Sequence, residues 1–214
     1  MVRTWPIASA AAFSAGLMAD PELTRAMTPL IDALEQMGIA YAIVGSVASS
    51  AHGIPRTTLD ADLVVDLQPS DVAPLVAAIE SSYYVDAEAV VDAVRRKSMV
   101  NIVHLDTMLK VDVYVLTSRP FDRDSFRRRS SRQLDDTPGA RAFFLASPED
   151  TVLNKLAWYS TGGEVSERQW SDVIGVIKVQ TRADALDLEY LRRWAASLRL
   201  TDLLERALAE AASP

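Results

Sequence analysis

Hydrophobic and polar residues follow two periods along this chain, one typical of strands and one typical of helices. Short apolar or alternating runs, bounded by glycine, proline or acidic residues, predict strands at 41–45, 59–67, 99–105, 108–116 and 143–146. Apolar positions three and four residues apart predict helices at 21–37, 46–52, 70–82, 87–97, 167–179, 187–197 and 201–211, with another beginning at 147. Strands and helices therefore alternate until about residue 146, after which the pattern is only helical.

This order of elements predicts an α/β (α+β) fold with a helical region at its C-terminal end. The expected organisation is an N-terminal arm at 1–24, a core at 25–146 and a C-terminal helical domain at 147–214. Ser147-Pro148 is a typical helix start, with a serine cap and a proline at the first helical position. Pro29 falls inside the first helix and predicts a kink there. Residues 119–141 are polar and arginine-rich, and their pattern predicts no regular element.

Composition limits the kind of metal site that the chain can build. Its 214 residues include no cysteine and only two histidines, His52 and His104, so a thiolate site is excluded and a zinc site is disfavoured. A hard cation held by oxygen ligands remains. The formal net charge of −7 argues against general nucleic-acid binding, which usually needs a basic domain. No apolar run reaches the roughly 18 residues of a membrane span, and a cytoplasmic location without a membrane partner is expected.

Three aspartates on predicted strands are the candidate metal ligands. Asp60 and Asp62 are two residues apart on one strand, so their side chains project from the same face. Asp112 is an isolated acid within the apolar strand 108–116, where an unpaired charge is costly. If these two strands are neighbours, the three carboxylates converge on a site suited to Mg²⁺. An Asp-x-Asp pair alone is more often solvated, and the third aspartate is what favours a metal site.

Gly45-Ser46 lies at a predicted turn from strand to helix, upstream of the aspartates. Glycine allows the backbone to approach a phosphate closely, and a helix N-terminus favours anions. The turn and the carboxylates together predict a phosphate site beside a divalent cation.

The pattern formed by Gly45, Ser46, Asp60, Asp62 and Asp112 resembles the nucleotidyltransferase superfamily related to DNA polymerase β. That superfamily has a Gly-Ser or Gly-Gly turn, a spaced Asp-x-Asp and a third aspartate on a later strand. The helix 147–157 with Lys155, and a partial match at Arg168 and Asp172, is most similar to the AbiEii-type toxin nucleotidyltransferases. The resemblance covers about residues 38–180, and it implies a small mixed sheet flanked by helices.

The resemblance also implies the role of each residue. Asp60 and Asp62 would hold two Mg²⁺ ions, with Mn²⁺ as an alternative. Asp112 would hold one of them and orient the attacking hydroxyl or accept a proton from it. Gly45 and Ser46 would bind the phosphates of a nucleoside triphosphate such as ATP. For Arg56 and Lys155, binding the triphosphate and lying on a solvated surface are equally weighted interpretations.

The acceptor of the nucleotidyl group stays open at this stage. One hypothesis is a toxin-like enzyme that modifies RNA or protein and has a cognate antitoxin. A second is transfer to a small molecule such as an aminoglycoside antibiotic, and a third is a non-catalytic antitoxin or binding protein, which three retained aspartates disfavour. Five arginines, at 123, 127, 128, 129 and 132, are a candidate RNA-docking surface, although such a run is more often solvated. His52 is expected to be structural rather than a nucleotide contact.

Overall fold

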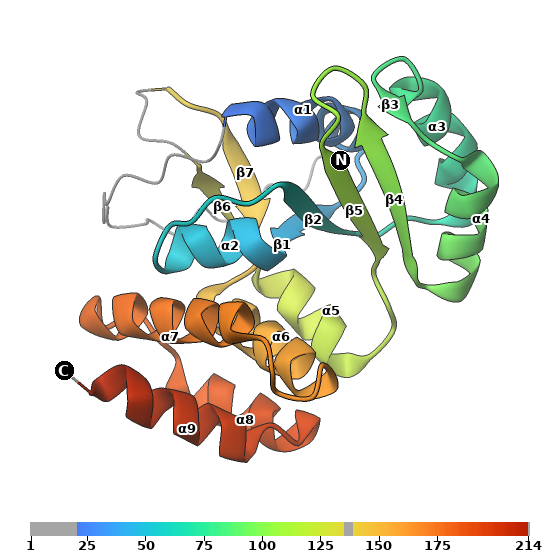
Figure 1. The fold of residues 1–214 in the computed structure, drawn as a ribbon. Helices are drawn as coiled ribbons and strands as arrows, with labels where there is room; N and C mark the ends of the chain where they lie inside the picture. Colours follow the sequence, from blue (N-terminus) through green and yellow to red (C-terminus); the bar gives the residue numbers. More distant parts are fainter. Residues whose placement is uncertain (1–20, 135–138, 214) are drawn as a thin grey trace, which may run out of the picture.

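The computed structural model describes residues 21–134 and 139–213 of the chain. Within these ranges, seven strands form one sheet in the order β3-β4-β5-β2-β1-β7-β6 (Figure 1). The strands are β1 (Tyr41–Val44), β2 (Asp60–Val65), β3 (Tyr83–Tyr84), β4 (Met99–His104), β5 (Lys110–Val115), β6 (Ser130–Gln133) and β7 (Ala142–Leu145). The pairs β2–β5 and β1–β7 are parallel and the other pairs are antiparallel, which confirms the mixed α/β fold.

The helices that accompany this sheet follow the predicted order closely. They are α1 (Pro21–Gln36), α2 (Gly45–His52), α3 (Val72–Ile79), α4 (Ala87–Arg96), α5 (Pro120–Arg128), α6 (Pro148–Thr161), α7 (Glu167–Arg182), α8 (Leu188–Leu198) and α9 (Thr201–Ala212), with a short 3₁₀ turn at Pro69–Asp71. Three of these elements were not predicted as such: α5 and β6 fall within the weakly patterned segment 119–141, and β3 has only two residues. The expected arm 1–24 lies almost wholly outside the described residues.

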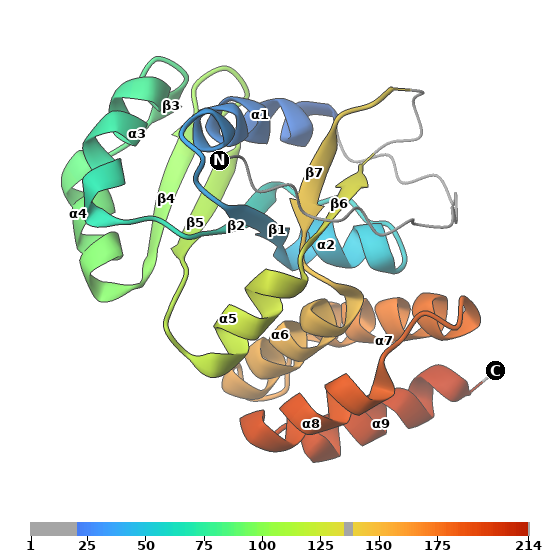
Figure 2. The same cartoon turned by 180° about the vertical axis from the view of Figure 1, so that it is seen from behind.

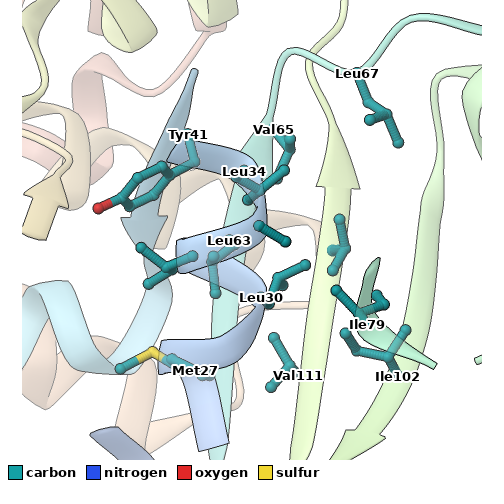
Figure 3. Close-up of a cluster of buried hydrophobic side chains, with 14 of the residues drawn as sticks. Met27, Leu30, Leu34, Tyr41, Leu63, Val65, Leu67, Ile79, Ile102 and Val111 are labelled. Atoms are coloured by element: carbon teal, nitrogen blue, oxygen red, sulfur yellow. The ribbon is translucent and has the colours of Figure 1, made fainter. Parts of the chain in front are cut away.

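One face of the sheet carries the larger hydrophobic core. Alternate residues of β2 and β5 are buried in one cluster with residues of α1, α3 and α4. Two of them, Leu63 and Val111, are completely buried and lie beside Leu30 of α1 (Figure 3). The alternation that predicted both strands thus assigns their odd-numbered residues to this core. The even-numbered residues, including the three aspartates, are left for the opposite face.

Helix α1 is stabilised at its proline by a tyrosine from the sheet edge. The hydroxyl of Tyr83 accepts a hydrogen bond from the Leu30 N–H at 3.0 Å and donates one to the Ala26 carbonyl at 2.7 Å. An uninterrupted α-helix would pair these two backbone groups with each other. A hydroxyl inserted between them satisfies both groups beside Pro29, where the prediction was a kink.

The C-terminal helices α6 to α9 enclose a second core and lie below the sheet in Figure 1, in contact with α2. Figure 2 shows the same layer from behind, with α5 between it and the sheet. The contact with α2 is close, because a Cβ on Gly53 would lie 2.7 Å from the backbone nitrogen of Val176. None of the helices in the described ranges is long and apolar enough to span a membrane.

Candidate active site

The strand register brings the carboxylates of β2 and β5 to neighbouring positions on one face. Asp62 and Asp112 are direct partners on the parallel pair, and Asp60 is the partner of Lys110. Adjacent strands are about 4.8 Å apart, so side chains that share a register and a face are in reach of each other. The neighbouring strands that the metal-site hypothesis required are therefore present.

Gly45 lies directly against Asp62. It ends the strand-to-helix turn with a φ of +61°, and a Cβ placed on it would lie 2.0 Å from Oδ2 of Asp62. Any larger residue would both strain the backbone and push this carboxylate away. The glycine thus explains how the turn and the Asp-x-Asp pair approach each other so closely.

Asp62 is the carboxylate whose ionisation is most affected by the cluster. Burial, followed by the negative charges of Asp60 and Asp112, raises its pKa from the ordinary 3.8 to about 6. The positive charges of Lys155 and Lys110 oppose this rise. Asp62 thus lies in a field of like charges that a divalent cation would relieve. As their side chains stand, residues 21–134 and 139–213 contain no group of three acidic or histidine residues arranged to hold a metal.

Both side-chain oxygens of Asp112 have partners among the neighbouring residues. Its Oδ1 accepts a hydrogen bond from the Asn101 amide, and its Oδ2 pairs with the Lys110 ammonium at 2.9 Å. The hydrogen bond to Asp112 raises the pKa of Lys110, and the negative charges of Asp112, Asp60 and Asp62 raise it further. Asp112 itself is buried, with 6% of its surface exposed. An amide and an ammonium therefore occupy the two oxygens of Asp112.

Arg56 connects the Gly45-Ser46 turn to the C-terminal helices. Its guanidinium forms a two-pronged pair with Asp172 of α7, at 2.8 and 2.9 Å, and donates to the Ser46 hydroxyl at 2.7 Å. The hydrogen bond to Asp172 raises the pKa of Arg56. A fork of this kind fixes the guanidinium in position, as a lysine would not.

Lys155 joins the same network from α6. Its ammonium lies 2.7 Å from Oδ2 of Asp172 and only 5% of the residue is exposed, so it is not a solvated surface lysine. Burial alone would raise the pKa of Asp172, but hydrogen bonds from Arg56 and Lys155 outweigh it and the pKa is lowered. Asp172 thus joins Arg56 to Lys155, and Arg56 in turn bonds Ser46. All three residues were predicted to bind nucleotide.

His52 and Arg168 were the weaker candidate site residues. His52 is buried, its Nε2 lies 2.7 Å from the Ala146 carbonyl, and burial lowers its pKa to about 4. It is a neutral structural histidine, as expected. Arg168, the other half of the partial downstream match, is exposed.

The arginine run on α5 and β6 is largely neutralised. Arg123 pairs with Asp66, Arg127 with Asp124, and Arg128 with both Glu149 and Asp150. Arg129 lies over the Phe126 ring and donates to the Phe126 carbonyl. Most of these cations serve contacts within the fold, which disfavours a free RNA-docking surface.

Three residues of this site were not predicted: Lys110, Asn101 and the central Asp172. Lys110 was open to prediction, because it precedes Asp112 by two residues and so shares its face. Asp172 was predicted only as a partial match to the family pattern. An acid next to the buried Val173 could also have indicated a buried carboxylate that needs a cationic partner. Asn101 depends on the β4–β5 register, which the sequence alone does not specify.

Comparison with known proteins relates this arrangement to a fold class. No family model matches the sequence, and neither does any curated protein. Among solved structures, the antibiotic-resistance factor ANT(2'')-Ia is similar with a TM-score of 0.53 at 13% identity, covering 88% of this chain and 98% of the other. The same factor in complex with adenylyl-2''-tobramycin gives a TM-score of 0.54 at 11% identity, with 83% and 97% covered.

A third similar structure is an antigenic nucleotidyltransferase-like protein from Paracoccidioides brasiliensis. Its TM-score is 0.53 at 17% identity, covering 91% of this chain and 95% of that one. At such identities the similarity establishes the fold, and the chain has the fold of nucleotidyltransferases.

Proposed function

We propose that the chain is a metal-dependent nucleotidyltransferase that moves a nucleoside monophosphate from a nucleoside triphosphate to an acceptor hydroxyl and releases pyrophosphate. The observation that carries the proposal is the register of Asp62 beside Asp112, with Gly45 pressed against Asp62. In an arbitrary sheet, paired acids at a buried position would be destabilising. Here they adjoin the Gly45-Ser46 turn, and the positive charges of Lys155 and Lys110 act on Asp62.

The donor set fits Mg²⁺, with Mn²⁺ as an alternative. Asp60, Asp62 and Asp112 offer only carboxylate oxygens, which hard cations prefer, and burial together with like-charge repulsion raises the pKa of Asp62. In this proposal Asp60 and Asp62 would hold two ions, and Asp112 would hold one of them. When bound, the ions supply charge stabilisation to the entering and leaving oxygens of the displacement. Asp112 orients the acceptor hydroxyl and takes its proton.

The nucleotide site is formed by the remaining predicted residues. The Gly45 backbone and the Ser46 hydroxyl bind the β- and γ-phosphates, while Arg56 and Lys155 offset their charge. The Asp172 pairs support this assignment, because they fix both cations beside the turn before any ligand arrives. ATP is one candidate donor.

For the acceptor, the resemblance of the sequence to the AbiEii-type toxins is the support for a macromolecule, RNA or protein, with an antitoxin as cognate partner. A small hydroxylated molecule is the second candidate. Two observations favour it: the net charge is −7, and several arginines of the run 123–132 are paired with acids. An acidic surface attracts a cationic drug and repels RNA.

The test is transfer of label from an α-³²P-labelled nucleoside triphosphate in the presence of Mg²⁺. Candidate acceptors are total RNA, a protein extract and an aminoglycoside, each in a separate reaction. Transfer should require the divalent ion, stop with EDTA and be lost in Asp62→Asn. The matched control is Asp66→Asn. Asp66 directly follows β2, the strand that carries Asp62, and its carboxylate pairs with Arg123. Binding of triphosphate that is equal with and without Mg²⁺, and no transfer to any acceptor, would contradict the proposal.

A further inference from the structure

We propose that the Lys110 ammonium is a built-in counter-ion of the carboxylate cluster, and that a divalent cation must displace it from Asp112 to bind. The inference rests on the proposed function, since it concerns the same metal site. It adds a residue that controls how readily the site accepts metal.

The contact geometry is the first argument. The two oxygens of Asp112 have different partners, the Asn101 amide at Oδ1 and the Lys110 ammonium at Oδ2, 2.9 Å away. A metal ion shared with the Asp60–Asp62 strand needs an oxygen from Asp112, and Oδ2 is held by a positive charge. Ammonium and metal therefore compete for one atom.

The charges around Lys110 give the second argument. Lys110 is the register partner of Asp60, and the negative charges of Asp60 and Asp62, as well as of Asp112, act on its ammonium. The other cation acting on Asp62 is Lys155, but that ammonium is fixed by Asp172 on α7. Lys110, on the same strand as Asp112, is thus the cation that the sheet places beside the three acids.

The two partners also differ in freedom. The Lys110 side chain is 46% exposed, whereas that of Asp112 is 8% exposed. The flexible ammonium can leave for solvent while the carboxylate stays in place. Metal binding to the free protein is then weakened by the free energy needed to displace Lys110 from Asp112. The negative charge of a nucleoside triphosphate would favour the replacement of the ammonium by the metal ion.

The experiment measures Mn²⁺ binding to the full chain by calorimetry without nucleotide. Lys110→Gln, which removes the charge but keeps a polar chain, should lower the Mn²⁺ dissociation constant by roughly tenfold. Lys110→Arg keeps the charge and should retain weak binding. Lys97→Gln is the control, because the Lys97 amine bonds the Leu67 carbonyl beyond the opposite end of β2.

A metal-free measurement tests the counter-ion directly. In EDTA, Lys110→Gln should lower the melting temperature at neutral pH, and a further Asp112→Asn change should recover it, because the unpaired carboxylate is then gone. Equal or weaker Mn²⁺ binding by Lys110→Gln overturns the inference, as does a melting temperature that Asp112→Asn does not recover.

Failure of the inference differs from failure of the proposed function. If wild type transfers nucleotide but Lys110→Gln leaves the Mn²⁺ dissociation constant unchanged, only the inference is wrong. If the constant falls as expected while no acceptor is labelled, only the proposed transfer is wrong. If neither wild type nor Lys110→Gln binds Mn²⁺, both the inference and the proposed function are wrong.

Discussion

Two aspartates of the site experience opposite electrostatic surroundings. Asp62 faces other carboxylates and has a raised pKa of about 6, whereas Asp172 faces Arg56 and Lys155 and has a lowered pKa. For Asp62, burial is the largest cause of the rise and the charges of Asp60 and Asp112 add to it, whereas for Asp172 the hydrogen bonds from Arg56 and Lys155 outweigh burial and reverse the sign of the shift. A residue like Asp62 destabilises the metal-free fold, which is expected of a group kept for binding a cation.

Asp62→Asn should therefore stabilise the metal-free protein at neutral pH. Because the folded-state pKa of about 6 exceeds the ordinary 3.8, the folded state binds more protons between these values, and wild-type stability falls as pH rises through them. In EDTA at pH 8 the asparagine variant should have a free energy of unfolding higher by about 1–3 kcal/mol, and near pH 4 the difference should vanish. Urea unfolding at both pH values measures this, with Asp66→Asn for comparison. A variant less stable at pH 8 would make Asp62 a structural residue.

Ser46→Ala should weaken nucleotide binding modestly while leaving the fold intact. The hydroxyl of Ser46 is half-buried and receives one hydrogen bond from Arg56, so its removal leaves no deeply buried group unpaired. We expect a loss of about 1 kcal/mol in the binding of a Mg²⁺-bound triphosphate, measured by calorimetry. Ser49→Ala is the control, because the Ser49 hydroxyl bonds within α2 to the Ser46 carbonyl. Equal effects of both variants would count against the phosphate role of Ser46.

The alternation of apolar residues along the strands and the spacing of the aspartates predicted the acids of the site, but not the residues that contact them. Asp60 and Asp62 on one strand face, and Asp112 on another strand, follow from the sequence. The contact of Asn101 with Asp112 and that of Arg56 with Asp172 join residues from different elements. Such contacts depend on register and helix packing, which the local pattern does not determine.

At the scale of elements, the missed helix α5 has a clear physical cause. Its sequence carries five charged residues among nine, and only Phe121 and Phe126 mark its buried face together with Ser125. A helix with so few apolar positions shows weak periodicity, and ion pairs to Asp66 and Glu149 contribute to its placement. By contrast, β2 and β5 alternate cleanly because one face lies on the main core.

Helix α1 offers a prediction at the same scale. Tyr83→Phe removes the hydroxyl between the Leu30 N–H and the Ala26 carbonyl, both buried, so the free energy of unfolding should fall by about 1–3 kcal/mol. Tyr84→Phe is a matched control on the next residue, 70% exposed, and should change stability very little. Thermal or urea unfolding of the two variants tests the difference. Equal stabilities would mean that α1 closes its own hydrogen bond when the hydroxyl is absent.

Over the whole molecule, the network around Asp172 links the sheet to the C-terminal helices. Arg56 belongs to the loop before β2, Lys155 to α6 and Asp172 to α7, so three separate segments meet at one carboxylate. This junction adjoins the Ser46 turn, and Lys155 acts electrostatically on Asp62. We therefore expect the region after Ser147 to form one wall of the nucleotide site rather than a detached domain.

Asp172→Asn should damage both stability and nucleotide binding. The change leaves the buried Lys155 without its carboxylate, and removing one partner of a buried pair typically costs about 3 kcal/mol of unfolding free energy. It also releases Arg56, so the dissociation constant of a triphosphate should rise by roughly tenfold. Mn²⁺ binding without nucleotide should be unchanged, because Asp172 is not among the proposed ligands. Glu205→Gln, in an exposed pair with Arg192, is the control and should alter neither property.

A double variant separates the two roles of this junction. In Asp172→Asn/Lys155→Met the deeply buried ammonium is gone and only Arg56, whose side chain is 25% exposed, loses its carboxylate, so most of the lost unfolding free energy should return. Nucleotide binding should stay weak, because one of the cations facing the triphosphate is gone and Arg56 is no longer fixed. Unfolding in urea and calorimetry with a Mg²⁺-bound triphosphate, performed on the single and double variants, give the two readouts. If the double variant regains stability and binds triphosphate as wild type does, the network serves only to join the helices to the sheet.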